Sequence, residues 1–161
     1  MAEKSDDQIK RDMWKKMADS PFLMVGLTDT HQHSEPLTAQ LDEDQVDTLW
    51  FFVGKDNRVA QGGSAMAQFV SKGQDYFACL SGTITQDTDR AMIDKLWNKQ
   101  VEAWFEGGKD DPNLALVRLD IDSAELWETD ISLSGRVKML FGGTIKASES
   151  SSHAKVETTA A

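Results

Sequence analysis

The chain has 161 residues and a formal net charge of −10, with 40% hydrophobic and 27% charged residues. That length favours one domain with one core, and the mixture of apolar and charged residues excludes a disordered chain. An acidic chain is a poor partner for nucleic acid or an anionic membrane, because phosphate groups are bound by clustered Lys and Arg side chains. No stretch approaches the ~20 apolar residues of a membrane span.

The chain has a single cysteine, Cys79, which excludes an internal disulfide framework. It lies in an alternating run of residues and is expected to be a strand residue rather than a reactive thiol. The segment from Met1 to Lys10 is polar and has no apolar signal-peptide core. These features predict a protein of a reducing, bacterial-type cytoplasm.

The N-terminal segment predicts a helix followed by two strands. Ser5-Asp6-Asp7-Gln8 has the form of a capping box, and apolar residues then recur every four positions until Pro21 ends the helix. The apolar run Phe22–Thr28 has no helical period and predicts a buried strand. A polar turn leads into a second strand, Pro36–Leu41, which closes a first hairpin.

Two histidines, His31 and His33, lie in that polar turn and form a His-x-His pair. No Cys or carboxylate motif nearby completes a metal shell, so we interpret them as exposed loop residues. The acidic segment Leu41–Asp47 lacks the spaced oxygen ligands and central glycine of a calcium loop, and we interpret it as a solvated connection.

The acidic connection leads to an apolar, aromatic strand, Leu49–Val53, and we expect this strand and Pro36–Leu41 to form the wall of a ligand site. A polar turn follows, and Arg58–Gln61 predicts a short helix. A strand that leads into a helix N-terminus presents free backbone N–H groups, and Lys55 and Arg58 add positive charge there. Such a corner suits a phosphate; the alternative is two surface cations without a ligand.

The middle of the chain predicts a barrel followed by a helix. Strands are expected over Ala65–Val70 and Asp75–Thr85, with Gly82 marking a bend or bulge. Several strands at short spacing indicate a closed or partly closed barrel. The segment from Asp87 to Phe105 predicts one helix with an aromatic stripe, which would face the core, a dimer partner or a flat ligand.

The C-terminal part predicts two more strands, Leu114–Ile121 and Ala124–Glu128, which pair with each other. Gly135–Gly142 then predicts a short helix or turn. From residue 143 the chain is rich in Ser, Thr and Ala and has little to bury. We therefore expect one domain over residues 1–142 and a flexible tail over residues 143–161.

Several segments, in this order and spacing, resemble the FMN-binding split barrels of the pyridoxamine phosphate oxidase-like superfamily, and among them the bacterial general stress proteins. The segments are Glu35–Gln40, Leu49–Asp56, Leu96–Phe105, Gly107–Pro112 and Glu125–Trp127. The resemblance implies a mainly β (α+β) fold, a six-stranded antiparallel split β-barrel with flanking helices. It also implies a homodimer that holds FMN at the subunit interface.

The same resemblance implies a role for each residue of the site. The backbone of the first strand would run along the isoalloxazine ring, and that of the aromatic strand would add contacts. Two cations would hold the phosphate, and a tryptophan of the other subunit would approach the flavin. In that order the residues are Pro36, Leu37, Thr38, Ala39 and Gln40; Phe51, Phe52 and Val53; Lys55 and Arg58; and Trp127.

The chain departs from the vitamin B6 oxidases at three positions. Glu35 and Gln40 stand where those enzymes carry Arg and Lys, and Val59 replaces the second of two consecutive cations. Vitamin B6 oxidase activity is therefore not expected, whereas FMN binding is. The sequence predicts an FMN-binding general stress protein, a flavin-dependent oxidoreductase of unknown substrate. The alternatives are a non-catalytic flavin sensor, carrier or store, and a relative that binds haem or F420.

Overall fold

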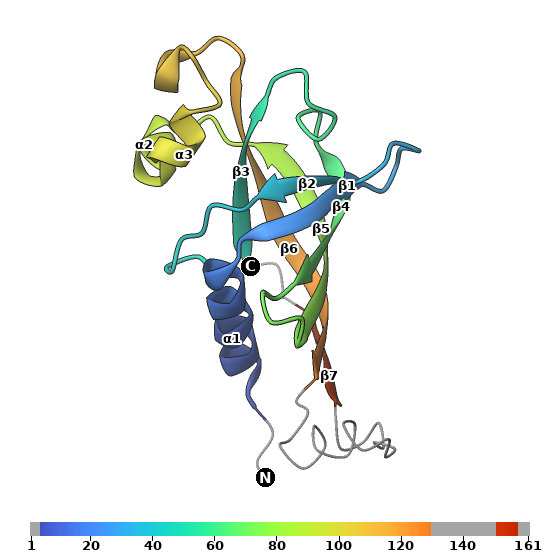
Figure 1. The fold of residues 1–161 in the computed structure, drawn as a ribbon. Coiled ribbons are helices and arrows are strands. Elements are labelled where there is room, and N and C mark those ends of the chain that lie inside the picture. The colour runs from blue at the N-terminus through green and yellow to red at the C-terminus, as the bar shows by residue number, and fades with distance from the viewer. Residues whose placement is uncertain (1–3, 130–150, 158–161) are drawn as a thin grey trace, which may run out of the picture.

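The computed structural model describes residues 4–129 and 151–157 (Figure 1). It begins with helix α1, Asp6–Asp19, and the predicted capping box is confirmed. The Ser5 hydroxyl accepts a hydrogen bond from the Gln8 N–H at 3.3 Å, and the Gln8 side chain accepts one from the Ser5 N–H at 3.0 Å. Both contacts satisfy N–H groups that a helix start leaves without a partner.

The described residues form a mainly antiparallel β structure with a few helices, as predicted. The main path of the sheet runs in the order β2-β1-β4-β5-β6-β3, and β7 pairs with the second half of β6. The strands are β1 Phe22–Leu27, β2 Glu35–Thr38, β3 Thr48–Gly54, β4 Gly63–Val70, β5 Tyr76–Gln86, β6 Leu114–Thr129 and β7 Ser151–Glu157.

The sheet curls so that its two ends, β2 and β3, come side by side without forming a ladder (Figure 1). A single bridge joins them, in which the Gln40 N–H donates to the Trp50 carbonyl at 2.7 Å and the Trp50 N–H donates back at 3.1 Å. The expected wall of two neighbouring strands is therefore present. It is held together at one point and open beyond it.

The interior of the barrel is filled by the inward face of each strand together with α1. Met13 and Met17 of α1 belong to the same buried cluster as Val25, Phe51 and Leu80. Trp50 points to the other side of β3, where it packs with residues of helix α2, Arg90–Leu96. The two faces of β3 are thus both covered, which explains its near-continuous apolar sequence.

The long strand β6 replaces the two short paired strands that the sequence predicts. Its register against β5 shifts between Ser81 and Gly82, where Asp122 is the extra residue of a bulge. A Cβ atom on Gly82 would lie 2.9 Å from the carbonyl carbon of Asp120, so only glycine allows this approach. The predicted bulge at Gly82 is confirmed, and it lets β6 continue where the sequence suggested a turn.

The prediction of a single helix from Asp87 to Phe105 is also wrong, because the helix is interrupted at Trp97 and Asn98. Helix α2 ends at Leu96, and a short helix α3, Lys99–Glu102, starts anew with Asn98 as its N-cap. A 3₁₀ turn, Gly108–Asp110, follows. The short helix predicted at Arg58–Gln61 is absent too, since that segment forms turns.

The expectation of a flexible tail from residue 143 does not hold for Ser151–Glu157, which form β7 and pair with β6. Val156 of this strand is buried, so even a Ser- and Ala-rich segment adds to the core when it extends a sheet. The helix or turn predicted at residues 135–142 lies outside the described residues. No helix within residues 4–129 and 151–157 is long and apolar enough to cross a membrane.

Candidate functional site

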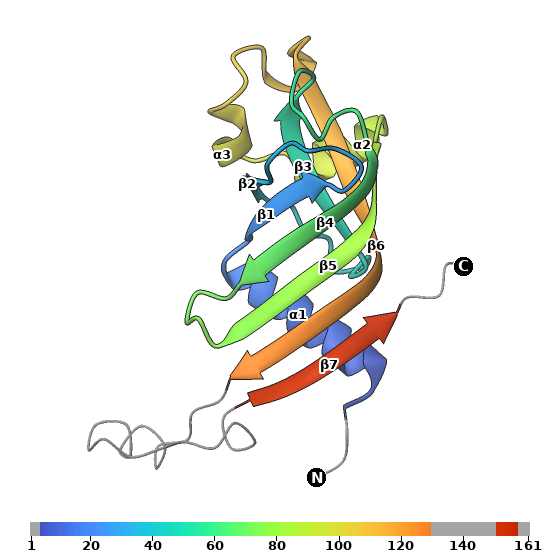
Figure 2. The same cartoon turned by 90° about the vertical axis from the view of Figure 1, so that its right-hand side faces the viewer.

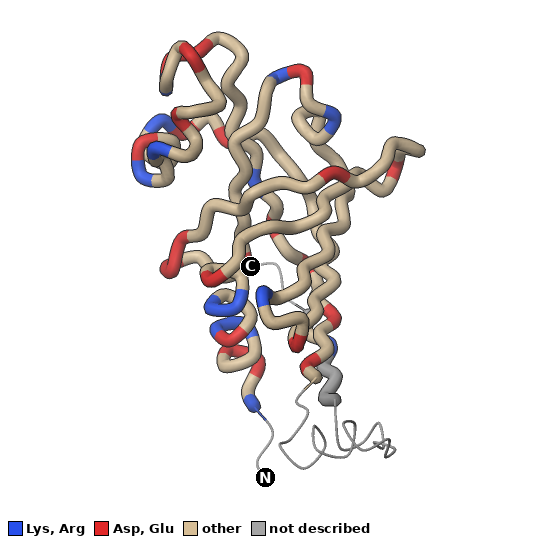
Figure 3. Tube along the Cα trace, viewed as in Figure 1, with Lys and Arg blue, Asp and Glu red and all other residues tan. Residues whose placement is uncertain are grey.

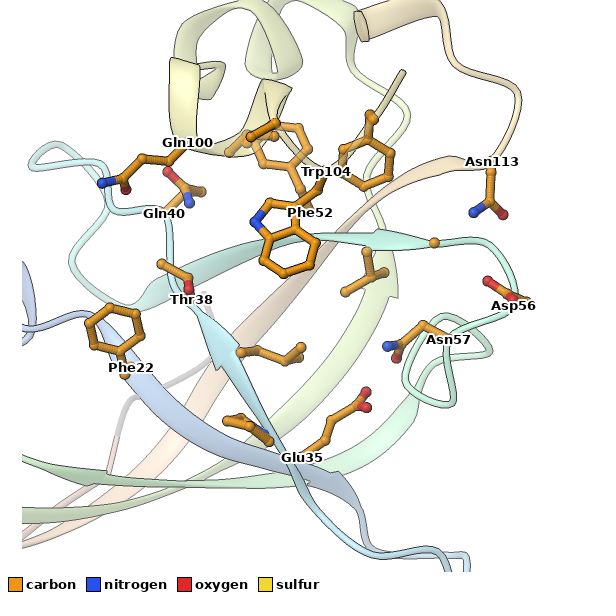
Figure 4. A pocket seen from close by; sticks show the side chains of 17 residues that line it. Phe22, Glu35, Thr38, Gln40, Phe52, Asp56, Asn57, Gln100, Trp104 and Asn113 are labelled. Atoms are coloured by element: carbon orange, nitrogen blue, oxygen red, sulfur yellow. The ribbon is translucent and has the colours of Figure 1, made fainter. Parts of the chain in front are cut away.

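A cleft of about 830 Å³ opens where β2 and β3 separate (Figure 4). Its walls come from β2, from the end of β3 with the turn after it, and from the segment Gln100–Phe105 at α3. Phe22 of β1 and Asn113 close its two ends. The volume lies within the range of about 300–1,000 Å³ that is typical of small-molecule sites.

The opening leaves backbone polar groups directed into the cleft. In an antiparallel ladder, successive residues direct their N–H and C=O groups to alternate sides. Ala39 donates to the Pro21 carbonyl on the β1 side at 2.7 Å, so its neighbour Thr38 directs its backbone groups to the cleft side. On β3, Lys55 donates to the Asn113 carbonyl at 2.8 Å, which by the same alternation turns the backbone groups of Phe52 toward the cleft.

Aromatic side chains cover the opposite wall. Phe52 and Trp97 meet edge to face with ring centroids 5.5 Å apart, and Phe105 lies 6.4 Å beyond Trp97. Trp104 stands in front of Phe52 in Figure 4, and it is 84% exposed. An aromatic ring that borders a cleft and is left so exposed is available to a flat ligand or to a partner subunit.

Two polar contacts tie this aromatic wall to the loop after β2. The Asn98 side-chain amide donates to the Gln40 side-chain oxygen at 3.0 Å. Lys95 on α2 donates to the Asp42 carboxylate at 2.7 Å, and the Asp42 side chain is only 3% exposed. The Lys95 contact, helped by the Asp44 backbone N–H, lowers the pKa of Asp42 below its usual value.

Among the described residues, the charged ones that line the cleft are both acidic, Glu35 and Asp56. Glu35 lies 3.6 Å from the Nε atom of Arg58, whose Nη1 also donates to the His33 carbonyl at 2.7 Å. Lys55 is exposed and lies between the lining residues Gly54 and Asp56. The connection between β3 and β4 thus carries basic and acidic residues side by side (Figure 3).

Of the predicted site residues, six line the cleft: Pro36, Leu37, Thr38, Gln40, Phe52 and Val53. Ala39, which follows β2, and Phe51 on β3 do not line it, and their side chains are buried in the barrel. Lys55 and Arg58 lie in the turns next to the cleft without lining it. Trp127 lies on β6, paired with Phe77, outside the lining of the cleft in its own subunit.

Sequence reasoning missed the wall that Gln100–Phe105 contributes. The aromatic stripe predicted from the sequence contains Trp104, and a flat ligand is one of its three interpretations. Its position could not be deduced, because it depends on the break at Asn98. His31 and His33 are both exposed, as predicted.

Comparison with known proteins shows clear relatives. The family model described as pyridoxamine 5′-phosphate oxidase like matches residues 7–152. A structure assigned to the general stress family, from Xanthomonas campestris pv. campestris, is 42% identical and covers 81% of this chain and 94% of its own, with a TM-score of 0.73. The general stress FMN/FAD binding protein of Xanthomonas citri is 44% identical, with coverages of 79% and 93% and a TM-score of 0.71.

More distant structures share the fold alone. A protein assigned as general stress protein 26, from Jannaschia sp. CCS1, is 23% identical and covers 96% of this chain and 100% of its own, with a TM-score of 0.79. A search of curated proteins gave no match. The family model and the two Xanthomonas structures each span most of the chain. The chain therefore belongs to the pyridoxamine 5′-phosphate oxidase-like family and, within it, to the general stress proteins.

Proposed function

We propose that this protein binds FMN in the cleft between β2 and β3 and acts as a flavin-dependent oxidoreductase whose substrate is unknown. The observation that carries the proposal is the opening itself, in which Thr38 and Phe52 direct backbone polar groups toward an aromatic wall. The name of the 44% identical relative from Xanthomonas citri, an FMN/FAD binding protein, supports a flavin as the ligand.

The residues of the cleft suit a flavin ring. The ring is flat, with apolar faces and a polar edge that both donates and accepts hydrogen bonds. Backbone N–H and C=O groups of β2 and β3 match the edge, and Phe52 with Trp104 offers aromatic faces. A bound flavin supplies the electron-transfer chemistry, whereas the protein orients the ring and limits its contact with water.

Lys55 and Arg58 are the cations placed to hold a phosphate at the end of the cleft near Gly54. Lys55 is exposed, and its neighbours Gly54 and Asp56 line the cleft. The turn after β3 also contains short-range backbone contacts rather than the predicted helix N-terminus. In this proposal, side-chain cations bind the phosphate without the help of a helix N-terminus. Specific binding of FMN therefore depends on these cations, whereas binding of the flavin ring does not.

We further propose a homodimer, in which a second subunit covers the outer face of the sheet. That face is opposite the side on which α1 packs (Figure 2). Val70, Phe77 and Trp127 pair across β4, β5 and β6 and form an exposed apolar row. Phe22 lies next in this row and also lines the cleft, so a partner that covered the row would reach the site.

The dimer is tested by placing a charge in the row. Phe77→Glu is expected to give a monomer in sedimentation analysis, because a buried unpaired carboxylate opposes association. Thr83→Glu is the matched control, since Thr83 is an exposed residue of the same strand outside the apolar row. A Phe77→Glu protein that sediments like the wild type would contradict this interface.

The cofactor is tested on the purified protein. The expected result is a yellow protein with a flavin spectrum that NADH or NADPH bleaches. A flavin that neither donor reduces favours the alternative of a flavin sensor, carrier or store. Colourless protein that takes up no added FMN would refute flavin binding.

The single cysteine, Cys79, supports a cytoplasmic location, which localisation of a tagged protein would test.

A further inference from the structure

Gln40 lies at the point where β2 and β3 part. Its backbone N–H and C=O groups are both used in the bridge to Trp50, at 2.7 and 3.1 Å. The polar group that Gln40 still offers to the cleft is therefore its side-chain amide, which lines the cleft together with Thr38. Figure 4 shows the amide nitrogen of Gln40 on the side of Thr38. The direction of this amide matters, because one end donates hydrogen bonds and the other end accepts them.

Asn98 determines which end of that amide faces the cleft. Its Oδ1 atom accepts a hydrogen bond from the Val101 N–H at 3.0 Å as the N-cap of α3, so its Nδ2 atom faces away from that helix. Nδ2 donates to Oε1 of Gln40 at 3.0 Å and to the Leu96 carbonyl at 3.3 Å. An amide nitrogen only donates, so Gln40 has to meet it with its oxygen. The Nε2 atom of Gln40 remains as a donor without an acceptor in the part of the chain that the structure describes.

We propose that Gln40 donates a hydrogen bond from Nε2 to an acceptor on the polar edge of the flavin ring, and that Asn98 is the positioning residue that holds the amide in this direction. The inference rests on the proposed function, because a flavin has to enter the cleft. A ring whose edge follows the backbone groups of Thr38 and Phe52 reaches Gln40 where the opening closes. The strands bond to each other there, and the amide supplies the next donor.

A partner subunit adds groups to the cleft without reversing this amide. The oxygen of Asn98 is held by an N–H group of α3 in the same subunit, and the backbone of Gln40 is held by Trp50. The result is a neutral donor with a fixed direction. A hydrogen bond to an acceptor of the ring favours the electron-rich, reduced form of a flavin. Gln40 is therefore expected to raise the reduction potential of the flavin as well as its affinity.

The first test removes the donor. Gln40→Leu replaces the amide with an apolar group of similar size. The affinity for FMN, measured by fluorescence titration of the protein freed of bound flavin, should fall roughly three- to tenfold, which is the effect of one hydrogen bond. A reductive titration against a reference dye should show a lower potential. A tenfold change in the ratio of the affinities for reduced and oxidised flavin corresponds to a shift of ~30 mV for a two-electron couple.

Asn98→Asp is the sharper variant, because it reverses the amide of Gln40 without removing it. An aspartate caps α3 as well as an asparagine does, but its second oxygen accepts a hydrogen bond instead of donating one. Gln40 then turns Nε2 to this carboxylate and Oε1 to the cleft. The affinity and the potential should fall at least as far as in Gln40→Leu. The urea midpoint of the flavin-free protein should stay at the wild-type value, because the cap is kept.

The matched control places the same charge where there is no amide to reverse. In a Gln40→Leu background, Asn98→Asp should cause little further loss of affinity or potential, because the positioning role requires both residues. A further loss as large as the one in the wild-type background would mean that the charge acts on the flavin directly. That result would overturn the positioning role of Asn98.

The outcomes separate this inference from the proposed function. Wild-type protein that binds no flavin refutes the function itself. Equal affinity and potential in the wild type and Gln40→Leu refute the inference alone. A change confined to the KM of an electron donor also overturns it, because the acceptor then belongs to a second molecule. Should Asn98→Asp not fold, Gln40→Glu keeps the contact with Asn98 and presents an oxygen to the cleft. A loss no greater than that of Gln40→Leu would then contradict the inference.

Discussion

Replacement of Trp104 by alanine distinguishes a ligand contact from a structural residue. The side chain is 84% exposed although it borders the cleft. An aromatic side chain of this size offers up to about 250 Å² of surface, so about 200 Å² remains available for contact. If a flavin covers half of that area, the contact contributes ~2.5 kcal/mol at about 25 cal/mol per Å².

Trp104→Ala should therefore weaken flavin binding roughly 50- to 100-fold, since 1.4 kcal/mol corresponds to a factor of ten. The free energy of unfolding should change by no more than about 0.5 kcal/mol, because little of the side chain is buried in the subunit. Fluorescence titration measures the first quantity and urea denaturation of the flavin-free protein measures the second. Trp104→Phe should recover most of the affinity.

Trp50 provides the contrast within the same chain. It is fully buried, and its Nε1 atom donates to the Asp87 carboxylate at 3.0 Å. Trp50→Ala should lower the free energy of unfolding by about 3–5 kcal/mol.

Unchanged flavin affinity in a folded Trp104→Ala protein would refute the stacking argument. A dimer that dissociates without loss of affinity would assign Trp104 to the subunit interface instead.

Three other changes test single features of the structure. Lys55→Ala should weaken FMN more than riboflavin, and an equal loss for both ligands in titration would remove Lys55 from the phosphate site. Gly82→Ala should destabilise the fold by about 3 kcal/mol in urea denaturation, because its Cβ atom would press on the backbone at Asp120 and no flexible side chain can yield. Asp42 has a lowered pKa in the folded protein, so its contact with Lys95 stabilises fully above about pH 4 and is lost as the pH falls through the folded pKa. In acid denaturation, Asp42→Asn should therefore reduce stability at neutral pH and flatten its decline toward low pH.

Local signals in the sequence predicted the features that local chemistry controls. The capping box at Ser5, the hairpin of β1 and β2, and the bulge at Gly82 each depend on a few neighbouring residues. The walls that β2 and β3 contribute to the site were also predicted, because the resemblance to the family covers those strands. Thr38 and Phe52 line the cleft, and their contacts with FMN stay a prediction.

Features that depend on distant contacts were not predictable in the same way. The apolar period runs through Trp97 and Asn98 without interruption, yet the helix breaks there because Asn98 caps α3 and donates to Gln40. The residues around Asp122 look like a turn, but pairing with β5 on one edge and β7 on the other carries β6 straight through. Tertiary hydrogen bonds override local preference at both places.

The helix break is what assembles the site from these parts. An unbroken helix would rise about 1.5 Å per residue, so it would place Trp104 about 10 Å beyond Trp97 along the axis of α2. The break at Asn98 instead starts α3 beside Gln40, and that residue is also the last backbone link between β2 and β3. One asparagine thus connects the aromatic wall to the point where the two strands part. The hydrogen bond between Asn98 and Gln40 therefore fixes the position of the Trp104 segment relative to the opening between β2 and β3.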